Sequence, residues 1–205
     1  MATNKNKINR AVNLVAALIT LYFLPATPVA ADNGHYVGFS YASGAKEVWD
    51  WHDDNLYLDE EDGGVIPMGL SYRYASQFRS GFRLDFGVGP FVVIYGDASY
   101  LDMPVQATLG YTFALRAHVR PYARLGASFH INDGDYVAEK AKLGALGAIG
   151  LEIGNPGSVS FFIEAAYDSA EATFSTDEYD GYLVRNDSEE DILVSNFLVT
   201  LGVKF

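Results

Sequence analysis

Eight stretches of this chain alternate apolar residues with polar or small ones, a period of two that is typical of β-strands buried on one face. Turn-forming residues separate them. The stretches cover 35–42, 65–74, 81–95, 103–113, 119–131, 143–153, 159–167 and a final run from about Ile192. Alternating segments of this kind predict an all-β fold, and their even number suits an eight-stranded antiparallel barrel.

The connections between these stretches alternate in length. Short ones follow Tyr74, Phe113 and Ile153, whereas the connections over 43–64 and 169–191 are long. The connections over 97–102 and 132–142 are intermediate. Transmembrane barrels have short periplasmic turns and long extracellular loops, so the pattern predicts both chain ends on the periplasmic side.

Two prolines interrupt the predicted strands. Pro90 lies inside the third stretch and Pro121 inside the fifth. Because proline cannot donate a hydrogen bond to a strand ladder, we expect a bulge or a strand end at each position.

The two faces of the strands differ in a way that assigns them to lumen and lipid. The polar face is rich in glycine, serine and threonine, which suit the crowded interior of a small barrel. We expect its charged residues to pair across the lumen. They are Arg73, Arg83, Asp85, Arg120, Arg124, Glu152, Glu164 and Asp168, with Lys204 near the chain end. The interior of such a barrel is filled by side chains, so no wide pore is predicted.

The apolar face carries almost no charge and has aromatic residues near the strand ends, among them Tyr41, Tyr72, Phe113 and Tyr167. Aromatic girdles of this kind border the apolar band of membrane barrels. The alternative is a secreted soluble barrel, in which the apolar face would line the interior. A soluble outer face would normally carry many lysines and glutamates and few glycines, so the composition favours the membrane barrel.

The N-terminal segment has the organisation of a secretory signal peptide. Three basic residues near the start, Lys5, Lys7 and Arg10, precede an apolar stretch over 11–24. That stretch is shorter than the roughly 20 residues that a spanning helix needs. We predict cleavage after Ala31, which leaves a single domain over 32–205; a retained N-terminal anchor is the alternative.

Composition excludes several classes of function. The chain has 26 acidic and 14 basic residues and no cysteine. Removal of the predicted signal peptide would take away three of the 14 bases and none of the 26 acids, leaving a net charge near −15. Such a charge argues against a nucleic-acid partner. The chain has no zinc-binding or P-loop spacing, so no cofactor is predicted.

The C-terminal stretch ends on an aromatic residue that closes an apolar stripe. The stripe consists of Phe197, Val199, Leu201, Val203 and Phe205. It resembles the signal by which the barrel-assembly machinery recognises outer-membrane proteins. The hairpin turn and strand over 115–126 is also similar to those of such barrels.

On these residues the chain resembles the small outer-membrane β-barrel superfamily, which includes the OmpA transmembrane domain, OmpX and OmpW. The resemblance implies an eight-stranded barrel, a monomeric state, and partners among the outer-membrane lipids, lipopolysaccharide and the assembly machinery. Functions within the superfamily are diverse, including adhesion, serum resistance, passage of small solutes and modification of lipid A, so the fold alone does not determine the activity.

The two long loops are strongly acidic, and oxygen-rich clusters can bind calcium or magnesium. The candidates for a divalent site in the first loop are Asp53, Asp54, Asp59, Glu60, Glu61 and Asp62. Their spacing does not match an EF-hand. A solvated acidic surface is the alternative that we favour, because runs of charge are usually exposed. Aromatic residues such as Trp49, Trp51 and Tyr57 lie among these acids and could contact a ligand or pack the loops together.

A serine and a histidine share the polar face of the fifth stretch. Ser128 and His130 could act as a nucleophile and its base, oriented by Asp133, Asp135 or Glu139. Lipid A deacylases use such a pair on a barrel strand, but in the order His-x-Ser-Asn, which this chain does not have. We favour a histidine that is hydrogen-bonded in the lumen, and so expect no enzyme.

The sequence therefore predicts an outer-membrane barrel that acts through its acidic, aromatic extracellular loops in surface interaction or envelope integrity. A narrow path for small solutes or hydrophobic molecules is the first alternative. An envelope hydrolase related to lipid A deacylases is the second.

Overall fold

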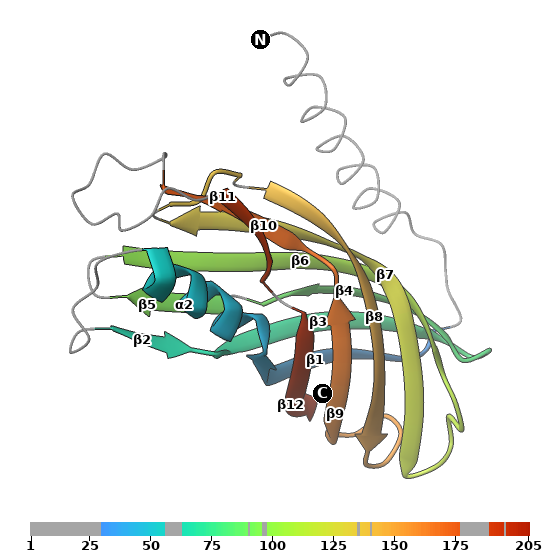
Figure 1. Cartoon of the computed structure of the whole chain (residues 1–205). Helices are drawn as coiled ribbons and strands as arrows, with labels where there is room; N and C mark the ends of the chain where they lie inside the picture. Colours follow the sequence, from blue (N-terminus) through green and yellow to red (C-terminus); the bar gives the residue numbers. More distant parts are fainter. Residues whose placement is uncertain are drawn as a thin grey trace, which may run out of the picture.

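The structure, a computed structural model, describes residues 30–55, 63–89, 91–95, 98–134, 136–139, 141–176, 189–194 and 196–205. Its barrel strands are β1 (Ala30–Ala42), β2 (Gly63–Ile66), β3 (Met68–Phe78), β4 (Phe82–Val88), β5 (Phe91–Tyr95), β6 (Ala98–Thr112), β7 (Val119–Gly134), β8 (Ala141–Ile153), β9 (Ser160–Asp168) and β12 (Phe197–Lys204). β2 leads into β3 and β5 follows β4, so each of these two pairs forms one long strand of the wall, and the barrel is eight-stranded (Figure 1).

The barrel closes because its first and last strands pair. β1 pairs antiparallel with β3 on one side and with β12 on the other. The remaining barrel strands pair with their sequence neighbours, and the β6–β7 ladder closes the ring. The predicted all-β, eight-stranded antiparallel barrel is confirmed. A closed barrel leaves no unpaired sheet edge, which is the condition for strands to cross a lipid bilayer.

The apolar face of the strands points outward. Phe39 is 68% exposed, Leu125 70% and Leu143 73%, and the predicted aromatic residues Tyr41 and Tyr167 are also exposed. On a closed barrel this exposed apolar surface faces lipid rather than water. The fold and this surface together place the protein in an outer membrane, and the soluble-barrel alternative is wrong. Among the described residues, no helix is long and apolar enough to cross a bilayer.

The strands extend further toward the outer end than the sequence predicted. The expected connection over 97–102 is mostly strand, because β5 runs to Tyr95 and β6 begins at Ala98. The last barrel strand begins at Phe197, later than predicted, because Ile192 belongs to a separate outer hairpin. The extra length of β6 carries Tyr100 into the outer core, where its ring packs 5.2 Å from that of Phe174.

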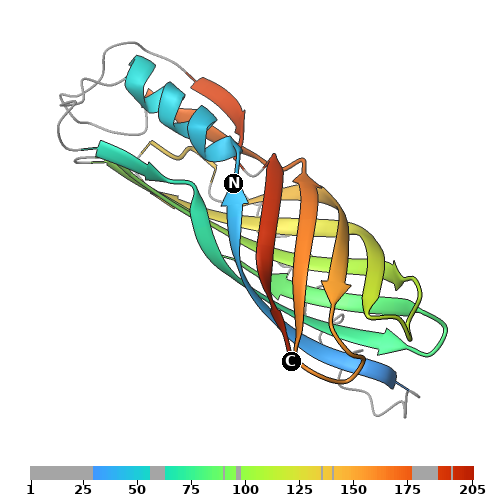
Figure 2. The same ribbon diagram turned by 90° about the horizontal axis from the view of Figure 1, so that it is seen from below.

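That outer core holds a helix and a hairpin that cover one end of the barrel, and the sequence did not predict them. They are α2 (Gly44–Asn55), β10 (Glu171–Ser175) and β11 (Glu189–Leu193), which we call the cap. Figure 2 shows the cap at the end of the barrel opposite the chain's C-terminus. α2 buries residues at helical spacing, including Ala45, Val48 and Trp51, against the hairpin. Its acidic residues, such as Asp50, lie on the opposite, exposed face.

The two prolines behave differently. Pro121 lies inside β7, which begins at Val119, and pairs with Leu151 in an unbroken register, so neither the bulge nor the strand end that we expected lies at this position. Pro90 lies outside the described residues, between the end of β4 at Val88 and the start of β5 at Phe91.

The predicted signal peptide lies almost wholly outside the described residues. β1 begins at Ala30, and its register with β3 shifts between Ala30 and Asp32 and is regular from there on. The regular barrel strand therefore begins at the residue that follows the predicted cleavage position.

Candidate functional site

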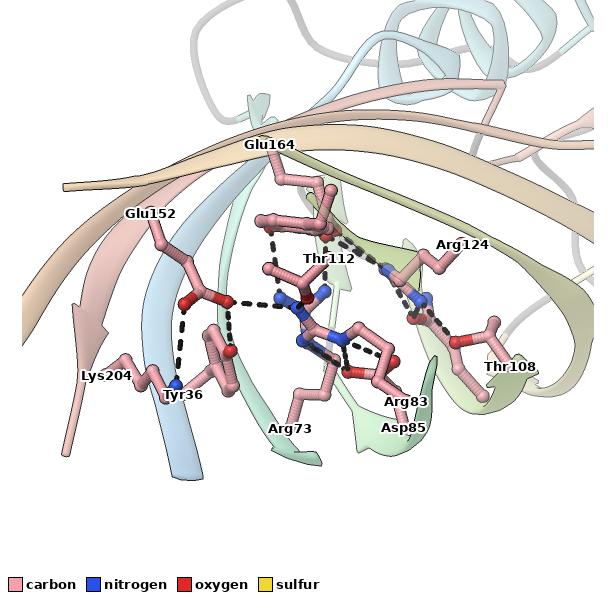
Figure 3. Close-up of polar contacts among 12 residues, drawn as sticks. Tyr36, Arg73, Arg83, Asp85, Thr108, Thr112, Arg124, Glu152, Glu164 and Lys204 are labelled. Carbon is pink, nitrogen blue, oxygen red and sulfur yellow. Dashed lines mark hydrogen bonds and ion pairs between the residues drawn. The ribbon is translucent and has the colours of Figure 1, made fainter. Parts of the chain in front are cut away.

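The half of the lumen nearer the C-terminus is filled by ion pairs around two carboxylates, which we call the lower network (Figure 3). Glu152, from β8, is the first. Its carboxylate lies 2.9 Å from Arg83 Nη1, 3.3 Å from Arg120 Nε and 3.4 Å from Lys204 Nζ, and it accepts a hydrogen bond from the hydroxyl of Tyr36. These groups come from five strands, so the carboxylate ties the wall together across the lumen.

Glu164, from β9, is the second centre of the lower network. Arg124 donates to both carboxylate oxygens, from Nε at 3.0 Å and from Nη2 at 2.7 Å. Arg73 Nη1 and the hydroxyl of Tyr122 also donate to Glu164 Oε2, the latter at 2.8 Å. Beside them Asp85 accepts two hydrogen bonds from Nε and one from Nη2 of Arg83.

Aromatic rings and a glycine let these groups fit together. The guanidinium of Arg73 lies 4.5 Å from the ring centre of Tyr36, and that of Arg83 lies 4.5 Å from the ring centre of Tyr122. A Cβ at Gly150 would lie 2.4 Å from Tyr122 Cζ, so only glycine leaves room for that ring. The charged side chains of the network are all at least nine-tenths buried. The lower network therefore fills this half of the lumen with buried, paired side chains.

Of the nine charged residues that the sequence assigned to the lumen, Lys204 included, eight lie in the lower network, and the ninth, Asp168, lies nearer the cap. The sequence reasoning included neither Tyr36 nor Tyr122 in the lumen network, although both lie on the polar parity of their strands. It also omitted Asp102, because that residue was assigned to a connection rather than to β6.

Asp168 takes part in a second buried cluster, the histidine clamp, made of Asp102, Ser128, His130 and Asp168. His130 Nδ1 lies 2.9 Å from both carboxylate oxygens of Asp102, and Nε2 lies 3.2 Å from Asp168 Oδ2. Ionised carboxylates only accept hydrogen bonds, so a ring that donates to both of them carries hydrogen on each nitrogen and is positively charged. Gly144 makes room for the cluster, since a Cβ there would lie 2.3 Å from Asp168 Oδ1.

The serine of the clamp is not arranged as a nucleophile. Ser128 Oγ donates to Asp168 Oδ1 at 2.7 Å, whereas both nitrogens of His130 face carboxylates. A general base needs a free nitrogen directed at the hydroxyl that it activates. The orienting acids that the sequence suggested are elsewhere: Asp133 is exposed, Glu139 pairs with Lys142, and Asp135 lies outside the described residues.

The acidic residues of the cap line a shallow groove between α2 and the β10–β11 hairpin, with a volume of about 350 Å³. Its acidic lining residues are Glu47, Asp50, Asp54, Glu171, Glu190 and Asp191. Of the divalent-site candidates, Asp53 and Asp54 lie exposed at the end of α2, and 59–62 lie outside the described residues. Within the described part of the chain, no three side chains are grouped so as to hold a metal ion.

One lysine at the outer end pairs with this acidic surface. Lys142 Nζ lies 2.7 Å from Glu139 and 3.7 Å from Asp191. The hydrogen bond to Glu139, with the negative charges of Asp191 and Glu171, raises the pKa of Lys142 above its ordinary value. The side chain therefore stays cationic and links β8 to the cap.

The barrel wall is interrupted between β3 and β4, a feature that we call the wall break. The ladder that pairs Tyr72 with Val88 does not continue into the one that pairs Ile66 with Val92. The first ladder ends at the pair Tyr72 and Val88, the second begins at the pair Ile66 and Val92, and Pro67 lies in the interruption. Leu70, in the wall break, pairs on its other side with exposed Phe39 of β1, so the interruption lies within the apolar belt.

A cavity connects the wall break with the lumen. The volume in which the centre of a water molecule fits is about 60 Å³, which is enough for several waters. Leu70, Tyr72 and Val88 line it on the lipid-facing side of the wall, and Arg73 and Arg124 line it from the lumen. We call it the side cavity. Irregular backbone at membrane depth is tolerated where it lines such a cavity.

The predicted assembly stripe faces outward. Phe197 is 62% exposed, Leu201 57% and Phe205 59%, with Val199 and Val203 on the same face. The last residue is held to the first strand by two backbone hydrogen bonds with His35, of 2.7 and 2.9 Å.

Comparison with known proteins identifies the fold. No family model matches the chain, and no curated protein sequence matches it. Among solved structures, the outer membrane protein OprG from Pseudomonas aeruginosa is 14% identical, with a TM-score of 0.56 over 87% of this chain and 97% of that one. Neisserial surface protein A (NspA) is 12% identical, with a TM-score of 0.52 over 84% and 95%. The chain thus shares the fold of small outer-membrane β-barrels.

Proposed function

We propose that this outer-membrane barrel acts at its outer end, through the acidic cap, in surface interaction or envelope integrity, and that it conducts no solute along its axis. The observation that carries the proposal is the cap itself. Closing an eight-stranded barrel requires only short connections, yet here a helix and a hairpin have a hydrophobic core of their own, around Trp51 and Phe174.

The charge of the cap indicates the kind of contact that it suits. Its core faces the barrel, whereas the carboxylates of α2 and β11 face the groove and the solvent. Complementary charge accelerates and selects encounters with cationic partners. A cationic protein or a basic surface is therefore the class of partner that we propose.

Two measurements test this function. We expect planar-bilayer recordings of the refolded barrel to show no large stable conductance, because the lower network fills half of the lumen with side chains. We expect cells that display the protein to bind polylysine-coated beads in a salt-sensitive manner. Asp50→Asn combined with Glu171→Gln and Glu190→Gln should weaken that binding. Equal binding by the variant, or a stable open channel, would contradict the proposal.

A second candidate function is a sideways path for small apolar molecules between the membrane and the barrel interior. The wall break and the side cavity favour it, because they connect lipid-facing Leu70 and Val88 with the lumen. Gly89 lines this passage, and a Cβ there would lie 3.4 Å from Ser71 Cβ, an ordinary contact. We expect Gly89→Leu to fill the passage and to slow uptake of an apolar fluorescent dye, relative to the unmodified barrel, in cells that express each.

A further inference from the structure

The charges that border the side cavity do not balance. Arg73 and Arg124 share the carboxylate of Glu164, and these three are the charged residues among the described ones that line the cavity. The nearest other carboxylate, Asp85, makes its hydrogen bonds with Arg83, and it lies 3.5 Å from Arg73 Nε without a hydrogen bond to it. The cavity side of the lower network therefore has one positive charge in excess.

The remaining charge excess of the lower network has other compensation. Toward the C-terminal end, Arg83, Arg120 and Lys204 face Glu152 and Asp85. There Arg120 Nη1 also donates to the backbone carbonyl of Gly154 at 2.7 Å and to that of Ala117 at 3.3 Å. Carbonyl dipoles stabilise a cation at that rim. On the cavity side the contacts of Arg73 and Arg124 include no backbone carbonyl; Arg73 lies over the ring of Tyr36 and donates from Nη2 to the hydroxyl of Tyr122 at 3.2 Å.

The guanidinium of Arg124 has hydrogen-bonding capacity that its neighbours use poorly. Nη1 lies 3.4 Å from Gln106 Oε1 and 3.4 Å from Thr108 Oγ1. Both distances exceed the range of about 2.7–3.2 Å that is usual for N–H···O bonds. Gln106 and Arg124 both line the side cavity. A carboxylate oxygen in the cavity would give these donors a charged acceptor, and such bonds are shorter and stronger than neutral ones.

Apart from the charged groups and Gln106, the cavity lining combines the polar residues Ser40, Ser71 and Thr200 with apolar side chains that continue to the wall break. Phe162 and Ala166 line it beside the arginines, and Leu70 and Val88 line it at the wall break. A ligand that matches this distribution has one anionic head and one apolar tail. The single excess charge suits a monocarboxylate better than a doubly charged phosphate.

We propose that the side cavity is a binding site for a monocarboxylate amphiphile of the fatty-acid class. Its carboxylate lies against Arg124 and Arg73, and its chain extends through the wall break into the membrane. The proposal rests on the sideways access described above and names the ligand of that path. It assigns to Arg124 a binding role in addition to its part in the lower network.

Calorimetric titration of the full chain in lipid nanodiscs, with empty nanodiscs subtracted, tests the proposal with three probes. Decanoate tests head and tail together, decanol the tail alone and acetate the head alone. We expect decanoate to bind at least about tenfold more tightly than decanol, the value of one charge-assisted hydrogen bond. Acetate should bind weakly. Equal affinities for decanoate and decanol would overturn the proposal.

Two variants at the head-group position sharpen the test. Gln106→Glu places a carboxylate beside Arg124, so it should abolish decanoate binding while raising the urea midpoint of unfolding. Arg124→Gln should weaken decanoate binding at least about tenfold and leave decanol binding unchanged. Arg120→Gln is the matched control, because Arg120 is equally buried on the same strand but does not line the cavity. Heat-modifiable gel mobility verifies that each variant is folded. Unchanged decanoate binding by the folded Gln106→Glu variant would refute the proposed site.

Gly89→Leu separates this site from the sideways path. If decanoate binding is lost in Gly89→Leu and in Gln106→Glu, the ligand reaches the arginines through the wall break, as proposed. If Gly89→Leu binds decanoate normally and Gln106→Glu does not, the carboxylate site stands and the sideways path fails. If neither variant changes the binding of decanoate, the proposed site is wrong even where dye uptake supports the path.

Discussion

At the scale of single residues, the charged side chains of the lower network are costly to bury, and each has several partners. A buried ion is stable only when its partners satisfy it, and removal of one partner leaves an uncompensated charge. Glu164 is the clearest case, because it accepts from Arg73, Tyr122 and Arg124 at once. Its two oxygens connect β9 with β3 and β7, which are not neighbours of β9 in the wall.

We therefore expect Glu164→Gln to lower the free energy of unfolding by about 3–5 kcal/mol, the usual cost of breaking a buried ion pair. Urea titration followed by heat-modifiable gel mobility measures the change. Glu190→Gln, on the exposed face of β11, is the control and should change stability by less than about 0.5 kcal/mol. Similar urea midpoints for the two variants would show that the network contributes little to stability.

Sequence reasoning at this scale found which residues face the lumen but not which of them bind one another. Because side chains alternate between the two faces of a strand, the sequence shows directly that Arg83 and Glu152 face the lumen. The division into a lower network and a histidine clamp depends on the register between neighbouring strands around the barrel. No single strand encodes that register. Asp102 shows the limit: its partnership with His130 becomes predictable only when β6 is known to begin at Ala98.

At the scale of elements, the cap is the part of the fold that the sequence indicated least clearly. A helical signal was present, since Ala45, Val48, Trp51 and Asn55 recur at the spacing of one helix face. Four acidic residues in the same segment favoured a solvated loop instead. The barrel strands were easier to predict, because alternation sustained over about ten residues is characteristic of strands in membrane barrels.

The helix is also tied to the barrel at its start, where Ser43 Oγ accepts a hydrogen bond from Phe197 N at 3.1 Å.

We expect Trp51→Ala to loosen the cap without opening the barrel. The indole is 4% exposed and packs 5.2 Å from the ring of Phe174, so its removal leaves a large cavity in a small core. The loss should be about 3–5 kcal/mol for the cap. Limited proteolysis from outside intact cells should become faster, while heat-modifiable mobility stays unchanged. Lys46→Ala, on the exposed face of α2, serves as the control; equally slow cleavage in both variants would contradict the packing role of Trp51.

At the scale of the whole molecule, two surfaces point in different directions: an apolar belt toward lipid and an acidic cap toward the outside. The comparisons identify the fold but, at 14% and 12% identity, do not identify the activity. What the sequence could not supply is the wall break. Pro67 lies in it, yet its extent follows from the register of four strands considered together.

The outward stripe at the C-terminus predicts a defect of assembly rather than of stability. Phe205→Ser should lower the amount of barrel found in the outer membrane of cells, because the stripe resembles the signal read by the assembly machinery. The same variant refolded in detergent should show nearly normal heat-modifiable mobility, since its side chain is 59% exposed. Phe82→Ser, equally exposed but remote from the stripe, is the control. Equal membrane levels of the two variants would argue against a recognition role.

The seam between the first and last strands has a consequence for how the chain is made. His35 and Phe205 exchange backbone hydrogen bonds across it, although almost the whole chain separates them. Synthesis must therefore reach β12 before the cylinder can shut, and every shorter nascent form has two open edges. Contacts of such long range form slowly, so both edges stay open to pairing with other chains until β12 docks on β1.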